Sequence, residues 1–273
     1  MKSAYFEYYK PKNIASAIDK ISDSCGENKL ISGGQSLSPM LNLRLVRPKT
    51  LVDISRITEL RKIENNHNNI RIGAAVTHAE IEDHNFDGLR ILSDVARGIA
   101  YRTIRNRGTI GGSLAHADPA GDWPLVLPAL GATIFVSGPR GERRILASEF
   151  MERAFTTKLN DNEIITAIQI PKLSAMARWG YWKFCRKMGE FPDASAAMLL
   201  DSERKIAELW IGALDGSPKP LNRFARELAV NGLKAFEHGI QVDELALNTP
   251  GLGPMRHQLL NTAIKRAVAK GFN

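Results

Sequence analysis

The stretch RNRGTIGGSLAHADPAGDWP, residues 105–124, places three glycines within five positions and follows them with a histidine and two aspartates. A shorter stretch, ISGGQS at 31–36, puts a glycine pair directly after an apolar run. Glycine tolerates a positive φ and lets another group reach the peptide N–H, because it has no Cβ. Glycines flanked by serine or threonine form concave rows of donors for phosphate oxygens. Either stretch alone is typical of a turn, but together they predict two loops that hold a pyrophosphate between them.

Two better-known phosphate motifs are absent from the sequence. The P-loop requires GxxxxGK[ST], and no Lys-Ser or Lys-Thr pair follows these glycines. The dinucleotide pattern GxGxxG is also missing, because Gly108, Gly111 and Gly112 have the wrong spacing. The sequence therefore disfavours a Rossmann domain.

Apolar periodicity around these stretches predicts an α+β chain. The expected strands cover 29–32, 50–54, 70–75, 132–137, 163–170, 179–186, 194–200 and 206–214. The expected helices cover 14–21, 89–103, 124–130, 221–236 and 254–270, and residues 138–144 are expected to form a turn. Thr77 precedes a further helix that carries Glu80 three residues later, which is the pattern of a capping box.

The character of the chain changes at PKLS, residues 171–174. Three predicted strands and the last two predicted helices follow this break. We therefore expect a larger domain over 1–173, divided into subdomains of about 1–55 and 56–173, and a smaller domain over 174–273.

Composition limits the class of protein. The chain has 273 residues, of which 44% are hydrophobic and 24% charged, so it is expected to be soluble and globular. No run approaches the roughly 18 apolar residues of a membrane helix, and a cytoplasmic location is expected by default. Cys25 and Cys185 form no CxxC pair, which argues against an iron–sulfur cluster or structural zinc held by this chain. The net charge of +8 is scattered, so it favours solubility first, an acidic subunit or phosphorylated cofactor second, and nucleic acid last.

Three segments, ISGGQSLSPMLNLRL, RNRGTIGGSLAHADPAGDWP and YWKFCRK, resemble the FAD-binding medium subunit of the molybdenum hydroxylases. This family includes carbon monoxide dehydrogenase, xanthine dehydrogenase and N-heterocycle hydroxylases. The resemblance runs from the N-terminus to about residue 215. It implies a fold of the vanillyl-alcohol-oxidase (PCMH) type, with FAD between two N-terminal subdomains. A small α+β C-terminal domain with a three-stranded antiparallel sheet is expected to follow.

The resemblance also implies a set of FAD-binding residues. Asp122 matches a position that binds ribose or ribityl hydroxyls, Lys183 a lysine near the flavin, and Ile165 an apolar residue that packs on the isoalloxazine. His116 is expected to be structural or to contact the cofactor, since no second ligand lies at metal spacing. The two diphosphate loops and their apolar flanks are Leu30, Ile31, Ser32, Gly33, Gly34, Gln35, Ser36, Leu37, Gly108, Thr109, Ile110, Gly111, Gly112 and Ser113. No catalytic and no metal-binding residue is expected.

Other interpretations of single residues stay open on sequence alone. Asp122 also suits a helix N-cap, and Lys183 also suits an exposed strand. His78, after Thr77, is most simply a surface residue of a first helical turn. The arginines at 102, 105 and 107 either neutralise the diphosphate or belong to a solvated turn.

Two departures from the family pattern stand out. Gln35 occupies a position where many relatives carry histidine, and the segment MGEFPD at 188–193 replaces an aromatic or small apolar run near the flavin. The final electron acceptor (NAD⁺, a quinone, a carrier protein or dioxygen) is therefore left open.

The expected function is that of an electron-transfer subunit carrying FAD. The resemblance implies a separate iron–sulfur small subunit that delivers electrons and a molybdopterin large subunit that oxidises the organic substrate. It also implies a dimer of heterotrimers. A stand-alone flavin oxidoreductase is one alternative, but the sequence offers no acid–base set for it. A nucleotide-binding scaffold without redox chemistry is the other.

Overall fold

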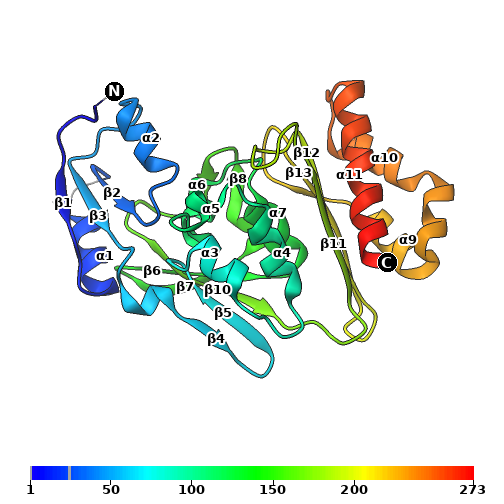
Figure 1. Ribbon diagram of the computed structural model, residues 1–273, viewed down its shortest axis with the longest axis horizontal. Helices are drawn as coiled ribbons and strands as arrows, with labels where there is room; N and C mark the ends of the chain where they lie inside the picture. The colour runs from blue at the N-terminus through cyan, green and yellow to red at the C-terminus, as the bar shows by residue number, and fades with distance from the viewer. Residues whose placement is uncertain (1, 24–25) are drawn as a thin grey trace.

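The computed structural model describes residues 2–23 and 26–273. Cys25, one of the two cysteines considered above, lies outside the described residues. The chain forms three successive layers, each built around its own sheet (Figure 1). Among the described residues, no helix combines the length and apolar character that crossing a membrane requires.

The first layer is a small parallel sheet in the order β1-β3-β2, formed by β1 (Glu7–Tyr9), β2 (Asn28–Ile31) and β3 (Thr50–Asp53). Helix α1 (Ile14–Ser22) begins at a capping box on Asn13 and buries Ala17, Ile18 and Ile21 in the cluster that contains Val52. The chain leaves β2 through the first glycine stretch and enters α2 (Leu37–Asn42). The first loop therefore lies at the carboxyl end of a parallel strand.

The second layer is an antiparallel sheet in the order β4-β5-β10-β6-β7. Its strands are β4 (Ile63–Asn65), β5 (Asn69–Gly73), β6 (Thr133–Gly138), β7 (Gly141–Leu146) and β10 (Ile164–Pro171). Its helices are η1 (Thr58–Arg61), α3 (His78–Asp83), α4 (Arg90–Gly98), α5 (Arg102–Arg105), α6 (Ile110–His116), α7 (Asp122–Ala129) and α8 (Ala147–Phe150). A short hairpin, β8 (Met151–Arg153) with β9 (Thr156–Thr157), follows α8.

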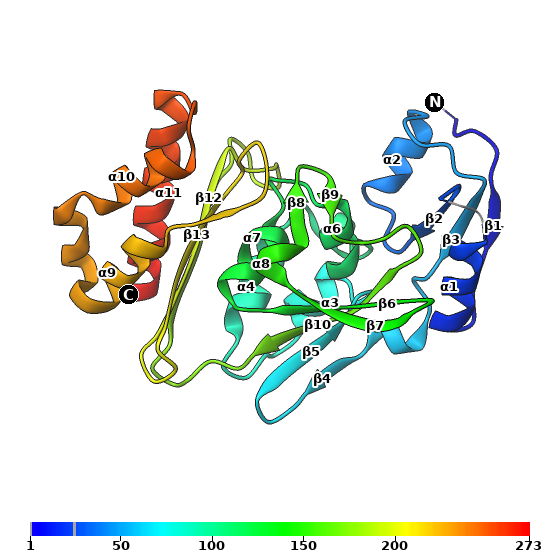
Figure 2. The same cartoon turned by 180° about the vertical axis from the view of Figure 1, so that it is seen from behind.

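The third layer is a sheet in the order β11-β12-β13-β14, with α11 (Pro254–Phe272) across one face (Figure 2). Its strands are β11 (Arg178–Phe184), β12 (Ala194–Asp201), β13 (Ile206–Gly212) and β14 (Lys219–Pro220), and the other helices are α9 (Asn222–Asn231), η2 (Gly232–His238) and α10 (Ile240–Asn248). The sheet has four strands rather than the three expected, because Lys219 and Pro220 pair with Ile211 and Trp210. So short a strand has no periodicity that the sequence could reveal.

Strand β12 is buried along its whole length and belongs to two cores. Ala196 and Met198 pack in the cluster with α9 and α11, whereas Ala197 and Leu199 pack in the cluster with α4 and α7. Side chains of a strand alternate between the two faces of its sheet, so this pattern places the sheet between the second layer and the terminal helices.

Most predicted elements are confirmed, and three predictions are wrong. The helix expected over 89–103 is two helices, because Ala100 has a φ of 41° and interrupts the chain between α4 and α5. The helix expected over 221–236 ends at Asn231, where Gly232 has a φ of 55°. Residues 138–144 contain only a tight turn, since Gly138 pairs with Gly141 and β7 begins there.

Candidate functional site

The two glycine loops meet. Thr109 Oγ1 donates to Ser32 Oγ across 3.1 Å, although the residues are 77 positions apart. A Cβ on Gly33 would lie 2.1 Å from the carbonyl oxygen of Arg107 and 2.8 Å from Cα of Gly108. Only glycine fits at position 33, because any side chain would push the two loops apart.

The first loop offers backbone donors. Within the part of the chain that the structure describes, none of the backbone N–H groups from 32 to 36 donates a hydrogen bond. Gly34 takes a φ of 71°, and Gln35 turns its amide back onto the carbonyl of Gly33 at 3.2 Å. Leu30, Ile31 and Leu37 are half-buried on either side of the loop. This loop therefore has the free N–H groups that phosphate oxygens accept from.

The second loop is built differently from our expectation. Gly111 N–H donates to the carbonyl of Ala74 at 2.9 Å, Gly112 N–H to Thr109 Oγ1 at 3.1 Å, and Ile110 N–H to Val76 at 3.1 Å. The stretch forms the first turn of α6 with Thr109 as its N-cap. The expected row of free N–H donors is thus incorrect for this loop, which offers the hydroxyl of Ser113 instead, since the Thr109 hydroxyl already donates to Ser32.

The glycines of the second loop serve close packing. A Cβ on Gly111 would lie 2.5 Å from Cβ of Ala74, and a Cβ on Gly112 would lie 2.8 Å from Thr109 Oγ1. The first contact brings α6 against the residue that follows β5, and the second leaves room for the cap. These glycines do allow another group to come close to the backbone, as expected. The groups that come close here are Ala74 and Thr109 of the protein itself.

Asp122 and Lys183 come together across two layers. Lys183 Nζ donates to Asp122 Oδ1 at 2.7 Å, and the Tyr181 hydroxyl donates to the same oxygen. Burial, with the nearby carboxylate, raises the pKa of Tyr181 well above its ordinary value. Asp122 is 7% exposed and follows the N-cap Gly121, so it is not itself the cap, and Lys183 is not an exposed strand residue. Asp122 Oδ2 accepts no hydrogen bond from any described residue.

Ile165 and His116 lie in apolar surroundings. Ile165 is 5% exposed in the core of the second layer, at a register shift of β10. The His116 ring lies 5.2 Å from the ring of Phe155. Among the described residues, no group of His, Cys, Asp and Glu side chains has the arrangement of a metal site.

The three arginines divide into two roles. Arg105 is 9% exposed, binds Glu82 at 2.7 Å and donates to the carbonyls of Ile99 and Ala100. Arg102 pairs with Glu82 at 2.9 Å and with Asp83. Both therefore fix the break between α4 and α5. Arg107 is exposed and makes no ion pair with a described residue, so it alone suits the neutralisation of a diphosphate.

His78, expected at the surface, is in fact buried. The side chain is 5% exposed, and Trp123 Nε1–H donates to its Nδ1 at 3.1 Å. Burial, and next the Arg105 charge, lower the pKa of His78 to about 4. The imidazole is therefore neutral near pH 7. No sequence signal links His78 to a tryptophan 45 residues away.

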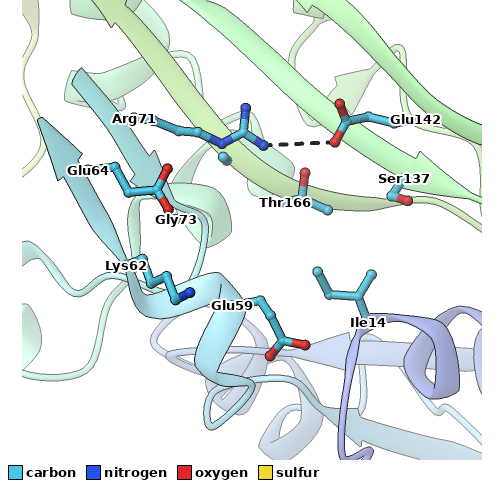
Figure 3. A pocket seen from close by; sticks show the side chains of 10 residues that line it. Ile14, Glu59, Lys62, Glu64, Arg71, Gly73, Ser137, Glu142 and Thr166 are labelled. Atoms are coloured by element: carbon cyan, nitrogen blue, oxygen red, sulfur yellow. Dashed lines mark ion pairs between the residues drawn. The ribbon is translucent and has the colours of Figure 1, made fainter. Parts of the chain in front are cut away.

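A separate pocket of about 240 Å³ lies between α1 and the outer face of the second sheet. Figure 3 shows its charged lining, in which Arg71 and Glu142 form an ion pair on one side of the pocket and Lys62 and Glu59 lie on the opposite side; the ion pair spans 3.8 Å. None of the predicted FAD-binding residues lines it. This pocket is therefore not the site that the glycine loops form.

Comparison with known proteins points to one family. Residues 4–173 match the family described as the FAD binding domain in molybdopterin dehydrogenase. The chain is 34% identical to the nicotine 6-hydroxylase medium subunit of Paenarthrobacter nicotinovorans, over 99% of this chain and 98% of that protein. It is 34% identical to the carbon monoxide dehydrogenase medium chain of Hydrogenophaga pseudoflava, over 80% of this chain and 77% of that one. A solved structure of carbon monoxide dehydrogenase from the same organism superposes with a TM-score of 0.93 at 28% identity, covering 100% of this chain and 99% of that chain.

Proposed function

This chain belongs to the family of FAD-binding domains of molybdopterin dehydrogenases, and from that premise we propose that it is the FAD-carrying electron-transfer subunit of a multi-subunit molybdenum hydroxylase. It takes electrons from an iron–sulfur small subunit and passes them to an external acceptor. A molybdopterin large subunit oxidises the organic substrate. The observation that carries this proposal is the junction of the two glycine loops at Gly33 and Thr109, with free N–H groups along the first loop.

The residues present fit FAD by their chemistry. The free N–H groups of 32–36 and the hydroxyl of Ser113 suit the diphosphate, and Thr109 holds the two loops together beside them. The free Oδ2 of Asp122 suits a ribose or ribityl hydroxyl, because a carboxylate accepts from diols. The apolar groups assigned to the ring systems are Leu30, Ile31, Leu37 and Ile165. When bound, FAD supplies a group that stores two electrons and exchanges them singly or in pairs.

Lys183 and Asp122 hold one another in place beside the flavin in this proposal. The ion pair fixes the Nζ charge at the junction of α7 and β11, where a cation favours negative charge on the ring. In this proposal each domain has its own task. Residues 1–173, as subdomains of about 1–55 and 56–173, carry the cofactor. Residues 174–273 cover the second layer. We further propose a dimer of heterotrimers.

The test is to purify the chain together with its iron–sulfur and molybdenum subunits. We expect one FAD released per chain on denaturation, with flavin bands at about 370 and 450 nm in the released cofactor. Native mass spectrometry will report the stoichiometry of the three subunits. A complex that assembles but takes up no FAD overturns the proposal. Anaerobic addition of NADH then tests NAD⁺ as the acceptor, since reduction of the complex by NADH shows electron exchange with nicotinamide.

A further inference from the structure

His78 is held in one protonation state and one tautomer by its surroundings. Tryptophan is a donor only, so the bond from Trp123 Nε1–H requires an unprotonated Nδ1. The ring proton of the neutral imidazole therefore lies on Nε2. Trp123 is fully buried, and the His78 backbone N–H donates to the carbonyl of Gly108 at 2.8 Å, so the ring has little freedom to turn.

The Nε2–H group is a donor without a partner among the residues that the structure describes. No hydrogen-bond acceptor for it is present among residues 2–23 and 26–273, and yet Nε2 is not one of the fully enclosed unsatisfied atoms. Nε2 therefore keeps some accessible surface, through which an acceptor from outside the described residues can reach it.

The edge of the ring that carries this donor packs against Gly108 of the second loop. A Cβ on Gly108 would lie 3.1 Å from His78 Nε2 and 2.9 Å from its Cδ2. A Cβ on Gly33 would in turn lie 2.8 Å from Cα of Gly108. Gly108 thus touches both the imidazole edge and Gly33, and the missing side chain at 108 lets the ring approach the second loop closely.

We propose that His78 is a further cofactor-binding residue, whose Nε2–H donates to a phosphate oxygen of the FAD held at the junction of the two loops. The inference rests on the proposed function and adds a neutral donor to the backbone groups of 32–36. Arg105 stands near the ring, but its guanidinium is bound to Glu82 at 2.7 Å, so the group that donates to the diphosphate here is the neutral imidazole.

Two substitutions separate the two nitrogens of the ring. The amide oxygen of His78→Asn can accept from Trp123 in place of Nδ1, but nothing replaces Nε2–H. The longer His78→Gln returns an amide N–H toward the Nε2 position. In the assembled complex, stripped of FAD and titrated with it, we expect His78→Asn to weaken FAD binding roughly 10- to 100-fold, as the loss of one hydrogen bond to a charged group does, and His78→Gln to regain part of it.

The ligand set distinguishes binding from mere support of the fold. A lost phosphate contact weakens FAD and ADP, which both carry a diphosphate, and leaves riboflavin binding unchanged. Equal weakening of FAD and riboflavin in His78→Asn overturns the proposal. If the variants do not fold, the structure of the wild-type complex with FAD decides: we expect a phosphate oxygen at about 3 Å from Nε2, and a nearest cofactor atom beyond about 4 Å overturns the proposal. FAD bound without this contact leaves the proposed function intact.

Discussion

Lys183 and Asp122 form a buried ion pair between β11 and α7. Replacing Lys183 with methionine keeps the length of the side chain but leaves the Asp122 carboxylate with only the Tyr181 hydroxyl. Breaking a buried pair from one side destabilises by about 3 kcal/mol, and the partial exposure of Lys183 reduces this. We expect the free energy of unfolding to fall by roughly 2 kcal/mol, measured by urea denaturation.

Lys187 provides the matched control, since it is exposed in the segment that follows β11. Lys187→Met is expected to change the unfolding free energy by less than about 0.5 kcal/mol. Equal losses in the two variants would show that the Asp122 contact contributes nothing particular to stability.

His78 gives the folded protein a pH dependence. Its pKa is about 4 in the folded chain and about 6.5 when unfolded, so the unfolded chain binds more protons between these values. Stability from this group is complete above pH 6.5 and declines as the pH falls toward 4, by roughly 3 kcal/mol in all. The difference in unfolding free energy between wild type and His78→Gln, followed from pH 7.5 to 4.5, is expected to shrink with acid. A constant difference would contradict this pKa.

The sequence predicts a residue's role where the amino-acid type alone indicates it. Gly33 and Gly111 were predicted because close backbone approach demands glycine, and the structure supplies that approach. His78 and Tyr181 were not found, because their roles come from partners 45 and 59 positions away. A buried histidine and a surface histidine look the same in a sequence.

The loop between β2 and α2 depends on one glycine for its position against the second loop. Gly33→Ala puts a methyl group 2.1 Å from the carbonyl oxygen of Arg107, and because that atom is backbone, the loops must separate. We expect the FAD content of the purified complex to fall at least tenfold and the chain to lose about 1–3 kcal/mol of stability. FAD released on denaturation and the thermal midpoint measure the two effects.

Gly216→Ala is the control for this element, since no atom lies within 4 Å of a Cβ built there. It should keep full FAD content and an unchanged thermal midpoint. If Gly33→Ala keeps its FAD as well, the contact between the two loops is not what forms the site.

Helix α6 shows why an element within the decisive stretch was missed. Two adjacent glycines in a first turn disfavour a helix by about 1 kcal/mol each relative to alanine, and we read them as a loop. The cap on Thr109 and the packing of Gly111 against Ala74 outweigh that preference. By contrast, the capping box of Thr77 and Glu80 was visible locally and is confirmed.

Across the whole molecule, the order of helices and strands could largely be predicted from sequence. The packing of one layer's residues in the core of another could not. The continuous apolar run of β12 was read only as a strand, although a strand without alternation is typical of one covered on both faces. The break at 171–174 was likewise read as a boundary, but Tyr181, Leu199 and Trp210 from beyond it pack in the core of the second layer. Periodicity reports that a residue is buried and does not report against which layer.

This shared core predicts how a truncated chain behaves. Every residue of α7 is buried, and α7 contacts β12 and β13 on one side and α6 and α8 on the other. A chain ending at residue 173 keeps the matched FAD-binding segment. It exposes α4 and the side of the apolar helix α7 that β12 and β13 cover in the full chain. We therefore expect residues 1–173 alone to bind the dye ANS and to lose the cooperative thermal transition of the full chain, while far-UV circular dichroism still reports helix and strand. A monodisperse fragment with a sharp transition would instead show that the boundary near 173 separates two independently folding domains.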